Sequence, residues 1–89
     1  MAQIIDFNRE RVKRAIALLI TKQEEAKMCW CIDNNREVPY ALYQKFLTYF
    51  IDHDMIPLQI VQGTLWGMKN WILDRVYEAI IERENRYVG

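Results

Sequence analysis

Asp52, His53 and Asp54 form the triplet in this chain that is most suggestive of chemistry. A histidine beside two carboxylates can have a raised proton affinity and act as a general base. No partnered serine and no second Cys/His cluster accompanies it at a recognisable spacing. The triplet also precedes Pro57 at a predicted helix end, where a histidine interacts favourably with the helix dipole. We therefore predict no catalytic residues and a protein that is not an enzyme.

Cys29 and Cys31 flank Trp30 and are the only two cysteines. A structural zinc ion needs four ligands, usually in spaced Cys or His pairs, and this chain offers one such pair and one histidine. Residues two apart on a helix point to different faces, so the two thiols should pack as small apolar groups. No glycine-rich run is present to cradle a phosphate. We predict no metal and no cofactor.

Gly63 and Gly67 lie four residues apart in a stretch that otherwise has a helical pattern. A glycine inside a helix costs about 1 kcal/mol relative to alanine, so the pair requires a structural reason. Small residues four apart allow two helices to approach closely. We therefore predict close helix packing, within the chain or between chains. The predicted packing or interface residues are Gly63, Trp66, Gly67, Trp71 and Trp30.

The same segment supports a second interpretation, in which the helix turns at the glycines. Gly63 and Gly67 are followed by three spaced aliphatic residues, Met68, Leu73 and Val76. Read from Gln59, this spacing resembles the helix-turn-helix motif of DNA-binding proteins, with Gly67 as the glycine of the turn. The resemblance implies a transcriptional regulator with a reading helix near residues 69–80.

Three residues of that helix would contact DNA if the resemblance holds: Lys69, Asn70 and Arg75. Asparagine and arginine suit base edges. Gln62, however, stands where the motif is apolar, and Asp74 would face phosphates. The formal net charge is zero, with 12 basic and 12 acidic residues, whereas phosphate binding needs clustered cations. We prefer the packing interpretation and keep nucleic-acid binding as the alternative.

The composition favours an interaction protein. Of the 89 residues, 52% are hydrophobic and 12% aromatic, whereas a chain this short buries only about 60–65% of its unfolded surface. Apolar surface should therefore remain exposed, which marks interfaces. We expect a homodimer and a further protein partner. No apolar run approaches the roughly 18 residues of a membrane span and no signal peptide is present, so we expect a cytoplasmic protein.

The helical pattern that must position these residues covers nearly the whole chain. Apolar residues recur at spacings of three and four, and the chain contains only three glycines and two prolines. We predict an all-α bundle in one domain, residues 1–89, with three to four helices at about 8–32, 39–54 and 57–86. The last helix opens on an almost heptad stripe, from Leu58 through Val61 and Leu65, and is broken near Gly63–Gly67 in the second interpretation. The predicted function is non-enzymatic protein–protein interaction or regulation, as an adaptor, antagonist or assembly factor.

Overall fold

The computed structural model describes the backbone of residues 2–88 and the side chains of residues 9–83. This part of the chain is helical and contains no strand, which confirms the predicted all-α fold. The helices are α1 (Ala2–Leu19), α2 (Lys22–Asp33), α3 (Tyr40–Asp52), α4 (Leu58–Val61) and α5 (Leu65–Val88).

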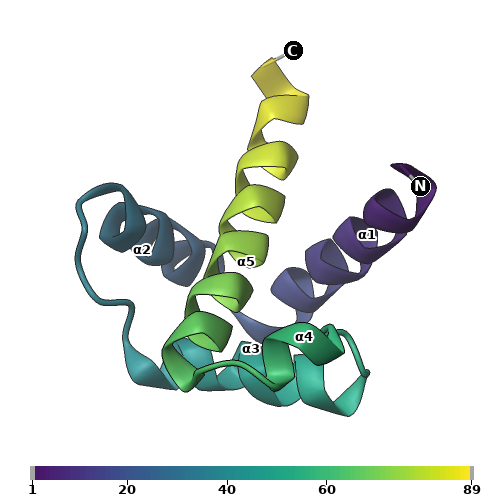
Figure 1. Ribbon diagram of the computed structural model, residues 1–89. Coiled ribbons are helices and arrows are strands. Elements are labelled where there is room, and N and C mark those ends of the chain that lie inside the picture. Colours follow the sequence, from purple (N-terminus) through teal and green to yellow (C-terminus); the bar gives the residue numbers. More distant parts are fainter. Residues whose placement is uncertain (1, 89) are drawn as a thin grey trace.

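Helix α5 is the centre of the arrangement and contacts each of the other four helices. It stands between α1 and α2, while α3 lies across its first half (Figure 1). One face of α5 is fully buried because aliphatic residues recur on it at spacings of three and four. Its buried residues are Ile72, Val76, Ala79 and Ile80. The other helices pack onto this face with Val12, Ala15 and Ile16 of α1, Met28 and Cys31 of α2, and Phe46 and Phe50 of α3.

The predicted single helix at 8–32 is wrong, because the chain breaks at Ile20 and Thr21. Thr21 is the N-cap of α2, with an extended backbone at φ −86° and ψ 170°. Its Oγ1 accepts a hydrogen bond from the Glu24 backbone N–H at 3.2 Å, and Glu24 Oε1 accepts one from the Thr21 N–H at 2.8 Å. This reciprocal capping box satisfies two backbone donors that a helix start leaves unpaired. It starts a second helix where the apolar pattern alone suggested continuity.

The break also changes which residues of α2 face the core. Ala26 and Trp30, which continue the stripe of a straight helix, are exposed. The buried residues are instead Met28, Cys31 and Glu25. Because α2 starts as a separate helix, its buried face is not a continuation of the buried face of α1.

Helix α3 forms close to the predicted 39–54. Pro39 immediately precedes it, where a missing N–H costs no hydrogen bond, and four residues of its apolar face are buried: Leu42, Tyr43, Phe46 and Phe50. The helix ends at Asp52, and the His53 backbone N–H bonds to the Tyr49 carbonyl at 3.0 Å. Asp54 then takes a left-handed conformation at φ 53°. This turn leads the chain away from α3 toward α4.

The segment predicted at 57–86 divides near Gly63, so the predicted break is present, but Gly67, the turn glycine of the second interpretation, lies within α5. Helix α4 is a single turn, and Gly63 lies in the connection to α5. Thr64 Oγ1 accepts a hydrogen bond from the Gly67 N–H at 2.9 Å and so caps the start of α5. Gly67 therefore belongs to the first turn of α5.

Ion pairs fasten the second half of α5 to α1 and α2. Glu82 pairs with Arg9 at 2.7 Å and also with Lys13, while Arg83 pairs with the buried Glu25 at 3.2 Å. The hydrogen bond to Glu82 raises the pKa of Lys13, although partial burial opposes it. Bonds from Lys13 and Arg9 lower the pKa of Glu82. These pairs tie α5 to both neighbours beyond the apolar core.

Candidate interaction surface and pocket

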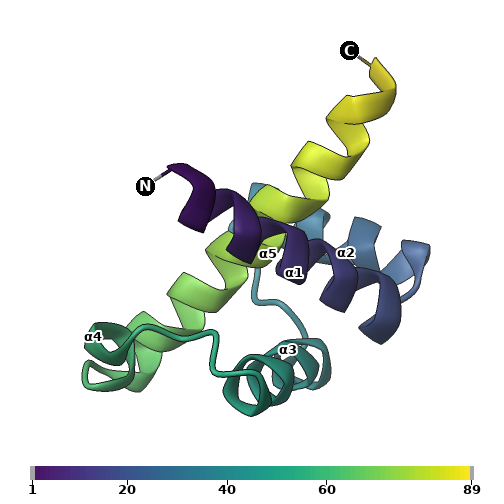
Figure 2. The ribbon, with the colours of Figure 1, turned by 90° about the vertical axis from the view of Figure 1, so that its right-hand side faces the viewer.

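Four large apolar residues of α4 and the first turn of α5 are exposed. They are Leu58, Val61, Leu65 and Trp66, and we call this part of the surface the α4–α5 corner; Trp66 also lines a hollow beside the loop between α2 and α3. The four side chains are 68%, 54%, 81% and 75% exposed, respectively. Figure 2 shows α4 beside the beginning of α5 at the edge of the molecule, away from α2. A group of large exposed apolar side chains on one surface is typical of an interaction site.

The local chain geometry explains why these side chains remain outside the core. Leu58 and Val61 are three residues apart on the single turn of α4 and share one face. Leu65 and Trp66 belong to the first turn of α5, before that helix reaches its first fully buried residue, Ile72. The almost heptad stripe that begins with Leu58, Val61 and Leu65 continues along α5 to Ala79, and it therefore has an exposed beginning and a buried end. The break at Gly63 separates the two parts.

Neither glycine of the pair carries a close helix contact within the described part of the chain. A Cβ on Gly63 would meet only backbone oxygens of its own segment, at 3.5 Å from Ile60 and 3.6 Å from Gln59. A Cβ on Gly67 would meet the Oγ1 of its cap, Thr64, at 3.1 Å. Close packing of these glycines within one chain is thus absent from residues 9–83. Packing against a second chain stays a prediction.

The two other tryptophans that we singled out lie in different environments. Trp30 is 57% exposed on α2. Trp71 is half-buried and meets the Phe50 ring edge-on, with ring centroids 6.2 Å apart. Trp71 therefore packs α5 onto α3, as a helix-packing residue does. Trp66 and Trp30 remain on the surface.

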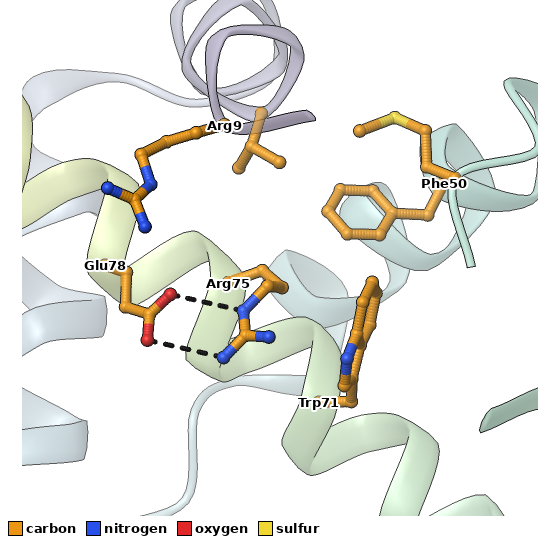
Figure 3. A pocket seen from close by; sticks show the side chains of 7 residues that line it. Arg9, Phe50, Trp71, Arg75 and Glu78 are labelled. Atoms are coloured by element: carbon orange, nitrogen blue, oxygen red, sulfur yellow. Dashed lines mark hydrogen bonds and ion pairs between the residues drawn. The ribbon is translucent and has the colours of Figure 1, made fainter. Parts of the chain in front are cut away.

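A pocket of about 390 Å³ opens between α1, α5 and the end of α3. Its walls are largely apolar and combine aromatic, aliphatic and thioether groups from Phe50, Trp71, Val12 and Met55. Three charged side chains complete its lining, and Figure 3 shows them together along one side of the pocket: Arg9, Arg75 and Glu78. The volume lies within the range of small-ligand sites, about 300–1,000 Å³.

Arg75 is held in place by two neighbours on α5. Its guanidinium lies 5.5 Å from the centre of the Trp71 ring, in cation–π range. Its Nε and Nη2 lie 3.2 Å and 3.3 Å from the two carboxylate oxygens of Glu78 (Figure 3). The Nη2 contact is a hydrogen bond, whereas Nε is buried and its N–H is not aligned with an acceptor. The ion pair between Arg75 and Glu78 therefore contains one hydrogen bond rather than two.

The residues of the DNA-binding alternative lie on the central helix. Residues 69–80 include most of the buried face of α5. Lys69 lies over the Tyr43 ring at 5.7 Å, and Arg75 is engaged with Trp71 and Glu78. Asn70 is half-buried beside the loop that joins α2 to α3. Two of the three side chains thus already have partners within the chain.

The His53 triplet and the Cys29/Cys31 pair, which suggested chemistry, make packing contacts and hydrogen bonds within the fold. His53 stacks on Tyr49 with ring centroids 4.0 Å apart, and its carbonyl accepts a hydrogen bond from Arg11 at 3.2 Å. Cys31 is buried in the core and Cys29 is half-buried beside it. Among the described residues, no three His, Cys, Asp or Glu side chains are grouped so that they could hold a metal ion.

Sequence reasoning missed the pocket because its charged residues come from different helices. Arg9 belongs to α1 and Glu78 to α5, and nothing in their local sequence indicates that the helices bring them together. No family model, curated protein or solved structure matches the chain. Within the described part, no helix has both the length and the apolar character needed to cross a bilayer.

Proposed function

We propose that this protein acts without catalysis, through protein–protein contact, as a cytoplasmic homodimer that forms at the α4–α5 corner. The observation that supports the proposal is the grouping of four large exposed apolar side chains between residues 58 and 66. In such a protein, a regulatory role would come from changes in the fraction of dimer. An adaptor role would come from a further protein that binds the surface of the dimer.

The apolar area of the corner is sufficient to drive weak association. Burying a large aliphatic or aromatic side chain contributes about 1.5–3 kcal/mol. For four side chains that are 54–81% exposed, the gain is roughly 4–8 kcal/mol in each copy. Association costs about 4–15 kcal/mol in lost freedom. Because the roughly 8–16 kcal/mol gained by two copies is of the same order as this cost, we expect weak dimerisation and test it at concentrations between about 1 µM and 1 mM.

A second copy is the partner that the chemistry of the corner favours. A two-fold dimer places the same patch of both copies together. Because the four side chains are uncharged, their mutual contact brings no like charges together. The close approach predicted at Gly63 and Gly67 would then occur between the copies, since no helix contact fills that space among residues 9–83.

The test is the concentration dependence of the molar mass, measured by sedimentation and by light scattering on a sizing column. The wild type should rise from 10.8 kDa toward twice that mass as its concentration increases through this range. The double variant Leu65→Ser, Trp66→Ser should weaken dimerisation at least tenfold. Leu18→Ser is the matched control, because Leu18 is 75% exposed on α1 and lies outside the corner.

A constant monomer mass up to about 1 mM would contradict the dimer proposal. An equal loss of dimer in the Leu18→Ser control would place the interface elsewhere on the surface. Addition of a random-sequence DNA duplex should leave the elution unchanged. Salt-sensitive co-elution with the duplex, lost in Asn70→Ala or Arg75→Ala, would favour the helix-turn-helix alternative instead.

A further inference from the structure

The pocket between α1, α3 and α5 has the composition of a binding site for a small amphipathic anion. We propose that it binds a hydrophobic monocarboxylate, with the aromatic or branched end among the apolar walls and the carboxylate beside Arg75. This site is separate from the α4–α5 corner and does not depend on the dimer proposal.

The apolar half of the ligand is indicated by the walls. Phe50 and Trp71 meet edge-on, and Met55 and Val12 line the space around them. Aromatic and thioether groups contact a ring or branched chain favourably. The volume of about 390 Å³ accommodates a ligand of this type, since small-ligand pockets begin at about 300 Å³.

The charged half of the ligand is indicated by Arg75. Arg9 also lines the pocket, but its guanidinium is already paired with Glu82 at 2.7 Å. The planar fork of arginine binds carboxylates in a bidentate manner. Trp71 holds the Arg75 guanidinium at the pocket, so that it is positioned before a ligand arrives.

Glu78 and the carboxylate of the ligand would compete for the same group, the guanidinium of Arg75. Glu78 pairs with Arg75 through Nε at 3.2 Å and Nη2 at 3.3 Å, and its own side chain is half exposed. The unaligned Nε–H shows that this internal pair uses the guanidinium incompletely. Removing the Glu78 charge should therefore tighten binding of the acid, which no purely structural role of Glu78 would produce.

The test uses NMR titration of the Trp71 indole N–H with phenylacetate and with phenylacetamide. The acid should bind at least about tenfold more tightly than the amide, because charge-assisted hydrogen bonds contribute more than neutral ones. The same comparison with acetyl-Gly-Phe and its C-terminal amide distinguishes a free small acid from the carboxyl end of a polypeptide. Preference for either acid over its amide supports the proposal and identifies the source.

Three variants complete the experiment. Glu78→Gln should tighten acid binding several-fold and Arg75→Met should weaken it at least tenfold, with helicity checked by circular dichroism. Arg14→Gln is the control, since Arg14 is exposed on α1 and does not line the pocket. Equal affinities for acid and amide in the wild type, or no shift of the Trp71 signal at millimolar acid, would overturn the proposal. That comparison needs no variant, so a misfolded Arg75→Met does not affect it.

Discussion

The boundary between α1 and α2 can be tested by Thr21→Ala, because the two possible structures predict opposite signs. In the structure, Thr21 Oγ1 accepts the Glu24 N–H at 3.2 Å as half of a capping box. Alanine removes this acceptor and leaves a helix-start donor unpaired. If residues 8–32 were one continuous helix, Thr21 would be an interior position, where alanine is the better helix former.

The two structures predict changes in the free energy of unfolding that differ enough to be distinguished. Loss of a threonine N-cap costs about 1 kcal/mol, within a range of roughly 0.5–2 kcal/mol. Replacement of an interior threonine gains up to about 0.7 kcal/mol. For a chain of this size, 1 kcal/mol corresponds to about 4–8 °C in melting temperature. We therefore expect Thr21→Ala to melt several degrees below the wild type.

Urea and thermal unfolding, followed by circular dichroism, measure the change. Thr48→Ala is the matched control, because Thr48 is exposed within α3 and should gain stability by its higher helix propensity. Glu24→Ala should lower stability as well, since Glu24 supplies the other half of the capping box. A stabilised Thr21→Ala, similar to the Thr48→Ala control, would refute the break between α1 and α2.

Three further predictions concern α5 and the turn before it. Hydrogen bonding from Lys13 lowers the pKa of Glu82 from its ordinary value of 4.5. The ionised Glu82 carboxylate therefore stabilises the fold above pH 4.5, and this contribution is lost as the pH falls through the lowered pKa of the folded state. Glu82→Gln should reduce the loss of stability in acid, measured by urea unfolding between about pH 7 and pH 3. Gly63→Ala should stabilise the monomer by about 0.4–1 kcal/mol, because Gly63 has no positive φ and no neighbouring helix near its Cβ; a loss of dimer in this variant would instead support packing between copies. Arg83→Met should destabilise by about 1–3 kcal/mol in urea unfolding, since it leaves the buried Glu25 carboxylate without its ion pair; an unchanged midpoint would show that this pair contributes little.

The sequence was sufficient to predict α3 because several signals agree there. Pro39 suits a helix start, the apolar spacing continues through Phe46 and Phe50, and Pro57 excludes a long extension. The fold class followed from the same periodicity over the rest of the chain. Where propensity, pattern and end signals coincide, the local sequence determines the element.

The break before α2 could have been predicted from Thr21 and Glu24, whose spacing is that of a capping box. The apolar pattern concealed it, because Ala26 and Trp30 continue the spacing of α1 as though the helix were straight. Gln23 is a polar residue four positions after Leu19 and three before Ala26, so it interrupts that apolar spacing, and it is exposed in the first turn of the new helix. A polar interruption beside a capping motif was therefore the signal of a new helix start.

The two candidate sites depend on tertiary arrangement, which explains why periodicity could not place them. The stripe from Leu58 to Ala79 has one pattern, yet its beginning is exposed and its end is buried, because the fully buried face of α5 starts only at Ile72. The pocket beside Trp71 exists because α1 brings Arg9 to the same side of α5 as Glu78. The same apolar composition therefore has two outcomes: it fills the core where other helices surround α5, and it leaves exposed apolar side chains where they do not. The break at Gly63 separates the two parts, since it ends α4 before α5 begins and leaves Leu58, Val61 and Leu65 exposed.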